Sequence, residues 1–222
     1  MNTVPTPDAA AHARALERGR LLFAQPCKFM WAADNVDGLP PDDLPEVAFA
    51  GRSNVGKSSL LNALVGQKAL ANVSQTPGRT QKLNFFALGE PPRLRLVDLP
   101  GYGYARVSKR AVDTWTQLIE DFLRGRQPLR RALVLIDVRV GLKDSDLAAL
   151  KVLDDAAVAT RLVLTKSDKA SAAELASTAE EVAAALKKHP AAFPEVVTTS
   201  ATKGAGIAEL RADLAELALP AR

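Results

Sequence analysis

The chain has 222 residues, with 29 Lys and Arg against 25 Asp and Glu, so its formal net charge is +4. This length fits one domain with a short appendage, and the 47% hydrophobic content allows a sizeable core without metal or disulfide support. The single cysteine, Cys27, excludes an intrachain disulfide and a cysteine-based zinc cluster, and we expect it to be a buried or neutral thiol.

The apolar runs are far shorter than the roughly 20 residues that a membrane span needs. The N-terminus lacks the apolar core of a signal peptide. The two histidines, His12 and His189, lie far apart in the chain, which argues against histidine-centred catalysis. We therefore expect a soluble, cytoplasmic protein with no membrane partner.

The spacing of apolar residues predicts helices and strands that alternate along the chain. A helix is expected over residues 8–23, followed by a proline-rich turn over residues 38–45. The further expected elements are a strand at 47–50, a helix at 58–65, a hairpin of strands at 83–88 and 94–97, an amphipathic helix from about 109 to 125, a strand at 133–136, a helix at 144–157, a strand at 162–164, a helix at 171–189, a strand at 196–198 and a helix at 207–217.

This alternation indicates an α/β fold, because short strands that are apolar on both faces need helices on both sides of their sheet. We expect a mixed, mostly parallel sheet of six strands, with the hairpin giving one antiparallel edge. Ligands of such folds bind at the carboxyl ends of the strands, so the loops there are the place to look for function.

The first of these loops reads GRSNVGKS and fits G-x-x-x-x-G-K-[ST] at every fixed position, between an expected strand and an expected helix. Its glycines let backbone N–H groups converge on phosphate oxygens, Lys57 can reach the β- and γ-phosphates, and the Ser58 hydroxyl can coordinate Mg²⁺. A chance match in a chain of this length has odds of about one per cent. The predicted phosphate-binding residues are Gly51, Arg52, Ser53, Asn54, Val55, Gly56, Lys57 and Ser58.

Two later strand ends carry further candidate residues. Asp98, Leu99, Pro100 and Gly101 end the strand at 94–97, where Asp98 provides a carboxylate on the magnesium side and the Gly101 N–H can reach a γ-phosphate. The strand at 162–164 ends in Thr165, Lys166, Ser167 and Asp168.

The carboxylate of Asp168 can accept hydrogen bonds from the guanine N1–H and N2–H₂ groups, a donor pair that adenine lacks, so it selects guanine. The Lys166 stem can lie along the purine face. Backbone N–H groups of Thr199, Ser200 and Ala201 can contact the guanine carbonyl. An exposed polar turn is the alternative interpretation of the segment around Asp168 if it stood alone.

Together these motifs resemble the ordered G motifs of translation-factor-class GTPases, and more closely the EngB (YihA/YsxC) family of bacterial ribosome-biogenesis GTPases. The likeness runs from about Phe29 to the C-terminus. Its distinguishing stretches are PEVAFA at 45–50, TPGRTQ at 76–81, DLPGYGYA at 98–105 and GLKDSD at 141–146. The resemblance implies a three-layer P-loop GTPase fold, with residues 1–44 as an N-terminal extension and residues 45–222 as the GTP-binding domain.

The resemblance also assigns a first switch segment, comprising Gly78, Arg79, Thr80, Gln81 and Lys82, with Thr80 joining Ser58 on Mg²⁺. From its residues alone, Thr80 is equally well an ordinary loop threonine. Two departures from other GTPases stand out. Thr165 occupies the place where small GTPases usually carry Asn, and Tyr102 the place of their water-orienting Gln.

Without that Gln no general base is evident, so slow intrinsic hydrolysis is expected, with Lys57, Thr80, Gly101 and Asn54 as the catalytic candidates. Related GTPases with Asn at the position of Asn54 bind K⁺ beside the phosphates. The resemblance therefore implies GTP and GDP as ligands, Mg²⁺ as the metal and, as a hypothesis, stimulation by K⁺.

The positive charge is concentrated in residues 79–131, which hold 11 Lys and Arg against 5 Asp and Glu, whereas the remainder has a net charge of −2. A solvated helix face is one explanation. The other is an RNA-facing surface beside the switches, with Tyr102 and Tyr104 stacking on bases. The basic residues concerned are Arg79, Lys82, Arg93, Arg95, Arg106, Lys109, Arg110, Arg124, Arg126, Arg130 and Arg131.

The partner that the resemblance implies is a large-ribosomal-subunit precursor, made of rRNA and ribosomal proteins. The expected function is that of a monomeric, nucleotide-switched assembly factor, needed for normal growth and for cell division or septation. A nucleotide-gated scaffold in division, in which hydrolysis is incidental, remains an alternative. Asp168 and the lack of an arginine-bearing lid argue against a third class, the ATP-dependent kinases.

Overall fold

The structure is a computed structural model that describes residues 7–68, 70, 82–102, 117 and 119–220. Its helices are α1 (Pro7–Phe23), α2 (Lys57–Val65), α4 (Asp144–Asp155), α5 (Ala172–Leu186) and α6 (Ile207–Ala215), with residues 119–125 also helical. Its strands are β1 (Cys27–Ala33), β2 (Glu46–Gly51), β3 (Leu83–Leu88), β4 (Leu94–Asp98), β5 (Leu129–Asp137), β6 (Thr160–Thr165) and β7 (Val197–Thr198), and two 3₁₀ turns are η1 (Val36–Gly38) and η3 (Ser167–Lys169).

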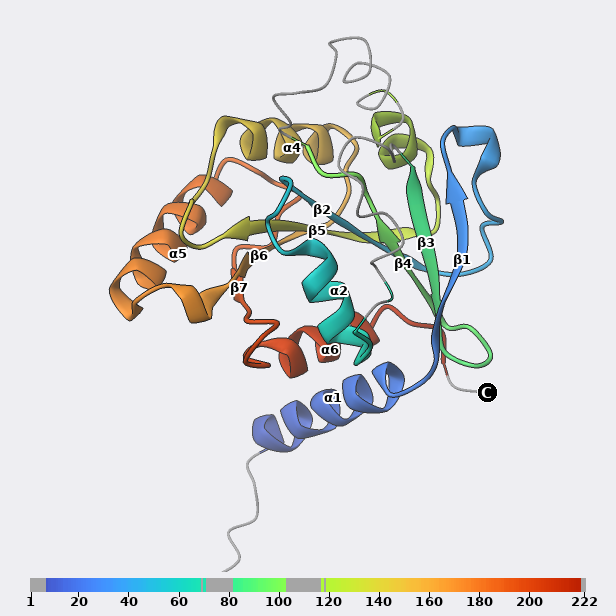
Figure 1. Cartoon of the computed structure of the whole chain (residues 1–222), viewed down its shortest axis with the longest axis horizontal. Helices are drawn as coiled ribbons and strands as arrows, with labels where there is room; N and C mark the ends of the chain where they lie inside the picture. The colour runs from blue at the N-terminus through green and yellow to red at the C-terminus, as the bar shows by residue number, and fades with distance from the viewer. Residues whose placement is uncertain (1–6, 69, 71–81, 103–116, 118, 221–222) are drawn as a thin grey trace, which may run out of the picture.

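The strands form one sheet in the order β1-β3-β4-β2-β5-β6-β7 (Figure 1). Five of them, β4, β2, β5, β6 and β7, run parallel to one another, whereas β3 is antiparallel to both β4 and β1. The α/β class and the antiparallel edge are confirmed. The sheet has seven strands where six were predicted, because β1, which lies in the segment expected to be an extension, pairs along the outer edge of β3.

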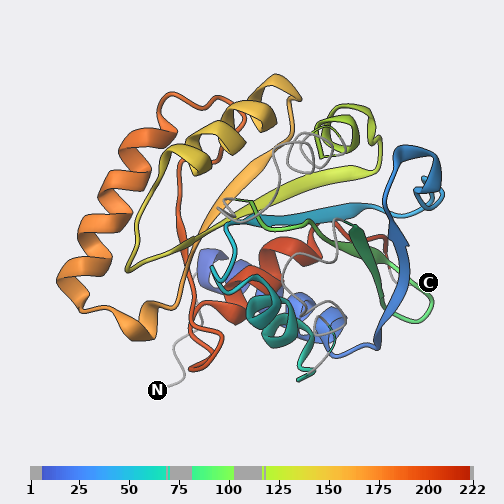
Figure 2. The same ribbon diagram turned by 45° about the horizontal axis from the view of Figure 1, so that its top comes forward.

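Helices cover both faces of the sheet (Figure 2). The alternation of side chains along β2 directs Val47 and Phe49 into one core, which is shared with α1, α2 and α6. Ala48 and Ala50 face the opposite core, which is shared with α4, α5 and the helical residues 119–125. The continuous apolar runs of the sequence therefore mark strands that are buried on both faces, which is the three-layer arrangement expected of a parallel sheet.

The expected helix at 8–23 is present as α1, and it packs against α6 (Figure 1). Gly19 lies at the crossing, where a Cβ atom would come within 2.6 Å of the Ala212 backbone nitrogen. The absence of a side chain at this position therefore lets the two helix backbones approach closely.

The other predicted elements agree with the structure to within a few residues, except that the helix expected at 109–125 lies partly outside the described residues. Cys27 is buried at the start of β1, and its burial raises the pKa of its thiol to about 12, so the thiol is neutral as predicted. No helix in the described part of the chain is long and apolar enough to span a membrane.

Candidate nucleotide-binding site

The phosphate loop joins the carboxyl end of β2 to the start of α2, as the sequence predicts. Two of its residues adopt left-handed backbone angles, Asn54 with φ 63° and Gly56 with φ 109°. Gly56 caps α2, and among the described residues no side chain caps this helix end. The first-turn N–H groups of α2 are thus available to an anion, and the helix dipole favours one there.

Lys57 and Asp98 form an ion pair at the base of this loop, with only 13% and 6% of their side chains exposed. Asp98 ends β4 directly beside Phe49 of β2, so the register of the sheet brings the carboxylate to the loop. Two predicted site residues from different motifs therefore meet in space. The Asp98 carboxylate and the Ser58 hydroxyl are both hard oxygen donors, the kind that Mg²⁺ prefers.

Gly101 lies against the phosphate loop, where a Cβ atom on it would be 3.1 Å from the Ser53 hydroxyl oxygen and 3.2 Å from the Ser53 nitrogen. This close approach explains why glycine stands at that position. The preceding Leu99 is fixed by a hydrogen bond from its N–H to the Phe49 carbonyl, and its side chain is buried in the core.

The residues predicted to bind guanine follow β6 and are tied to the phosphate loop. The Thr165 hydroxyl is buried and donates to the Val55 carbonyl at 2.6 Å. The Lys166 ammonium donates to the Asn54 carbonyl at 2.5 Å. Thr165 thus connects the two motifs through its hydroxyl, a contact that a sequence comparison with Asn-bearing GTPases does not reveal.

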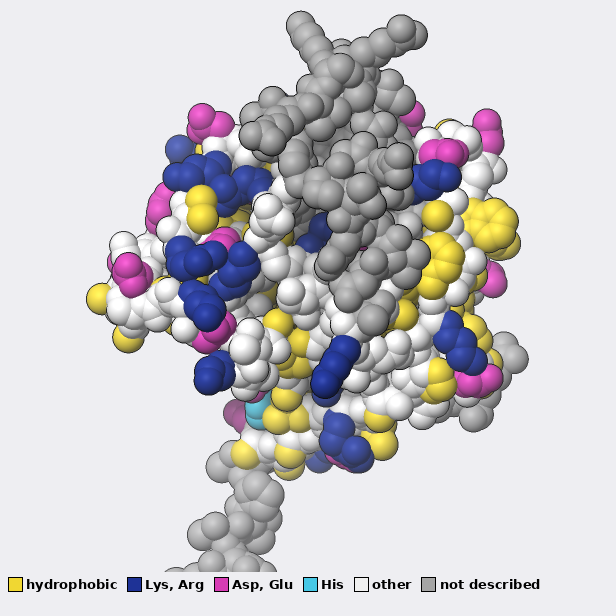
Figure 3. Space-filling model, in the orientation of Figure 1, with side chains coloured by type: hydrophobic (Ala, Val, Ile, Leu, Met, Phe, Trp, Pro, Cys, Tyr) yellow, Lys and Arg dark blue, Asp and Glu magenta, His cyan; other side chains and the backbone are white. Residues whose placement is uncertain are grey.

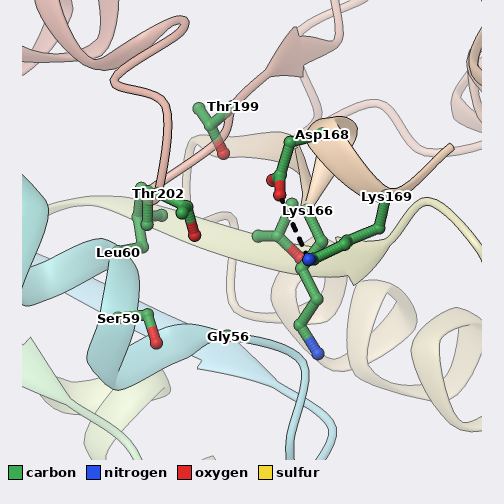
Figure 4. Close-up of a pocket in the computed structure, with 10 residues that line it drawn as sticks. Gly56, Ser59, Leu60, Lys166, Asp168, Lys169, Thr199 and Thr202 are labelled. Carbon is green, nitrogen blue, oxygen red and sulfur yellow. Dashed lines mark ion pairs between the residues drawn. The ribbon is translucent and has the colours of Figure 1, made fainter.

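A cavity lies between the start of α2 and the loop that follows β6, and Asp168 and the loop after β7 line the side away from Gly56 (Figure 4). The Ser200 hydroxyl donates to the Asp168 carboxylate at 2.6 Å, and this hydrogen bond is the main reason that the pKa of Asp168 is lowered. The carboxylate is therefore ionised and acts as an acceptor at neutral pH. The cavity has a volume of about 120 Å³ and is lined by Gly56, Ser59, Leu60, Thr165, Lys166, Asp168, Lys169, Thr199, Ala201 and Thr202.

Several residues at the site were not singled out from the sequence. Asp137 ends β5 and forms ion pairs with Lys166 at 3.0 Å and with Arg139 at 2.7 Å. Burial raises its pKa, but hydrogen bonds from these two cations outweigh burial and bring the pKa down to about 2. The available signal was its position after a predicted strand, at the edge of the sheet where the other site residues lie.

Four residues of the first switch, Gly78 to Gln81, lie outside the described residues, including Thr80. Lys82 is described, and its ammonium forms an ion pair with Asp34 at 3.3 Å. Within the described part of the chain no three acidic, cysteine or histidine side chains form a metal-binding cluster. The oxygen donors present at the phosphate loop, the Ser58 hydroxyl and the Asp98 carboxylate, are compatible with Mg²⁺, which takes one or two protein oxygens together with phosphates and water.

The prediction of a basic surface over residues 79–131 is corrected for three arginines, which are buried. Arg95 and Arg126 bind the fully buried Glu46, and Arg131 binds Asp213 at 2.6 Å. These guanidinium groups are buried and paired with carboxylates, fully buried for Glu46 and partly buried for Asp213, so they are not available to an RNA. On the face in Figure 3, Lys and Arg side chains gather instead over the side that carries α4 and α5.

Comparison with known proteins places these features in a family. Residues 46–166 match the family described as 50S ribosome-binding GTPase. A protein of Rhodospirillum rubrum, named probable GTP-binding protein EngB, is 55% identical over 216 residues, which cover 96% of this chain and 94% of that protein.

Two solved structures share the fold. A probable GTP-binding protein engB has a TM-score of 0.61 at 22% identity, covering 78% of this chain and 97% of that chain. Era in complex with MgGDPNP and nucleotides 1506–1542 of 16S ribosomal RNA has a TM-score of 0.62 at 26% identity, covering 81% of this chain and 58% of that chain. With a P-loop GTPase fold and an EngB relative that matches almost end to end, this chain belongs to the EngB family of GTPases.

Proposed function

We propose that this protein binds GTP and GDP with Mg²⁺, hydrolyses GTP slowly, and acts as a nucleotide-switched assembly factor for the large ribosomal subunit. It would work as a monomer in the cytoplasm, with residues 45–222 as its GTP-binding domain. Its contribution to normal growth and to cell division or septation would follow from ribosome assembly.

One observation carries the nucleotide part of this proposal. Gly56, at the positive end of α2, and Asp168, an ionised acceptor, line the same cavity (Figure 4). The first suits a phosphate and the second suits the N–H groups of guanine. A single cavity with these two ends fits a guanine nucleotide. An adenine nucleotide would bind less tightly, because adenine lacks the donor pair that the Asp168 carboxylate accepts.

The roles of the residues follow from their contacts. The Lys57 ammonium pairs with the Asp98 carboxylate, and on nucleotide binding it would pair with phosphate oxygens instead. Ser58, in the first turn of α2, and Thr80 would hold Mg²⁺, which neutralises charge on the phosphates when bound. Thr199, Ser200 and Ala201 keep the β7 loop beside Asp168, and the Ser200 hydroxyl orients the carboxylate.

The ribosomal part is supported by the matched family, whose description names 50S ribosome binding, and by the likeness to Era, which was solved with MgGDPNP and ribosomal RNA. The test is co-sedimentation of the protein with large ribosomal subunits in GDP or in a non-hydrolysable GTP analogue. We expect association with the GTP analogue only. Equal or absent association in both nucleotides would contradict the ribosomal role and would favour the scaffold in division.

We further propose that K⁺ stimulates hydrolysis through Asn54, in place of the missing Gln. Its left-handed backbone and exposed side chain put it at the mouth of the phosphate loop. Turnover in KCl is expected to exceed turnover in NaCl, and Asn54→Ala should abolish that difference. Equal rates of the unmodified protein in the two salts would refute this proposal.

A further inference from the structure

A second group of polar side chains lies beside the phosphate loop and joins three separate segments. Arg52 belongs to the phosphate loop, Tyr102 follows the DLPG motif, and Asp146 lies in the first turn of α4. Asp146 is fully buried. Its carboxylate accepts from the Tyr102 hydroxyl at 3.0 Å, from Arg52 Nε at 3.2 Å and from the Lys143 backbone N–H at 2.9 Å.

Each of these contacts has a physical reason. A buried carboxylate is costly unless a cation and hydrogen bonds compensate it, and Arg52 supplies the cation. The Arg52 guanidinium also donates to the Gly141 carbonyl at 2.8 Å, so it points toward the loop before α4. Burial, and then the negative charge of Asp146, raise the pKa of Tyr102, which keeps its hydroxyl protonated and able to donate.

The main chain repeats this connection. The Tyr102 N–H donates to the Gly51 carbonyl at 3.3 Å, and the Ser53 N–H donates to the Tyr102 carbonyl at 3.2 Å. With Gly101 packed on Ser53, residues 98–102, here called the DLPGY segment, are docked on the phosphate loop. The Ser53 N–H of the loop and the Tyr102 N–H of the segment are therefore both engaged in hydrogen bonds between the loop and the segment.

We propose that Asp146 is a positioning residue that holds the DLPGY segment in this docked position through the Tyr102 hydroxyl, and that GTP must release it. This inference rests on the proposed GTP switch, in which the Gly101 N–H serves the γ-phosphate. GDP has no γ-phosphate and leaves the docked position undisturbed. The contact between Tyr102 and Asp146 therefore lowers the affinity for GTP relative to GDP.

The test compares the affinities of Tyr102→Phe and of the unmodified protein for GDP and for a non-hydrolysable GTP analogue. Removing one hydrogen bond to a charged acceptor should raise the ratio of GTP-analogue affinity to GDP affinity about tenfold. Asp155→Asn is the matched control, because Asp155 is an exposed acid at the other end of the same helix, and it should leave the ratio unchanged. An unchanged or lowered ratio in Tyr102→Phe would overturn the proposal.

A double-mutant cycle shows whether the hydroxyl acts through Asp146. Asp146→Asn should raise the ratio in the same direction, and adding Tyr102→Phe should then have little further effect. Fully additive effects, or weaker binding of both nucleotides with an unchanged ratio, would show a merely structural role. Tyr102→Phe alone decides the question if Asp146→Asn does not fold. An unmodified protein that binds neither nucleotide would refute the proposed function itself.

Discussion

At the scale of single residues, the cavity depends on side chains that hold one another in a defined charge state. Asp168 is fixed by Ser200, and Lys166 is fixed by Asp137 and by the Asn54 carbonyl. Each of these two charged groups at the guanine end therefore has a partner within the chain. These contacts within the chain fix the positions of both charges.

Asp168→Asn tests guanine recognition. The substitution keeps the shape of the side chain but turns one acceptor oxygen into an N–H donor facing the donors of guanine. We expect the affinity for GDP to fall about 100-fold from the loss of hydrogen bonds to a charged acceptor. Titration calorimetry with GDP measures the change. Asp155→Asn, away from the cavity, serves as the control, and an affinity of Asp168→Asn close to that of the unmodified protein would contradict the assignment.

Asp137 predicts how stability depends on pH. Its pKa in the folded protein is about 2, below its ordinary value of 3.8, so ionisation of this group stabilises the fold above pH 4. That contribution, about 2 kcal/mol, is lost as the pH falls from about 4 to 2. Asp137→Asn should therefore be less stable than the unmodified protein at pH 7, in urea unfolding, and nearly equal to it near pH 2. An equal difference at both pH values would refute this account.

The sequence predicted the residues whose chemistry depends on a local pattern. The phosphate loop and Asp168 follow strands in short motifs, and the structure brings both to one cavity. It did not predict Asp137 or Asp146 as part of the site, because Lys166 is 29 residues from Asp137 and Arg52 is 94 residues from Asp146, and only the fold brings each pair together. The burial of Arg95 was missed for the same reason: Glu46 lies on a neighbouring strand.

At the scale of elements, strands with continuous apolar runs were predicted and β1 was not. The residues of β1 are buried only at its two ends, and Phe29, Met30 and Trp31 are exposed at the sheet edge. The sequence of β1 does contain an apolar run, FMWAA at 29–33, but this run lies within the stretch expected to be an N-terminal extension, so the prediction misses a strand that the sequence supports. Its place is fixed by backbone pairing with β3, which includes an irregularity between Phe29 and Trp31.

The packing of α1 on α6 gives a prediction at this scale. Gly19→Ala improves helix propensity by up to about 1 kcal/mol, but its Cβ would collide with the α6 backbone. We expect a net loss of about 1–3 kcal/mol in the free energy of unfolding, which is typical of overpacking. Gly125→Ala is the matched control, since nothing lies within 4 Å of the position that its Cβ would take and it should not destabilise. A Gly19→Ala variant as stable as the unmodified protein would mean that the helices do not cross this closely.

At the scale of the whole molecule, the net charge of +4 has a different distribution from the one its sequence suggests. Three arginines of the basic stretch at 79–131 are buried and paired with the carboxylates of Glu46 and Asp213. The exposed cations among the described residues include Lys169, which lines the cavity beside Asp168, and Arg139, which pairs with Asp137, the partner of Lys166. A ribosomal contact made through these exposed cations would therefore lie on this side of the molecule.

The most direct test of the proposed role is GTP turnover in K⁺ buffer with and without purified large ribosomal subunits. The protein alone should turn over slowly, because Tyr102 replaces the water-orienting Gln. The subunits should accelerate turnover by about tenfold or more, a modest effect beside the roughly 10³–10⁵-fold that an arginine finger supplies in other GTPases. Small subunits at the same concentration are the control and should have no effect. Turnover that large subunits leave unchanged would contradict the proposed role in their assembly.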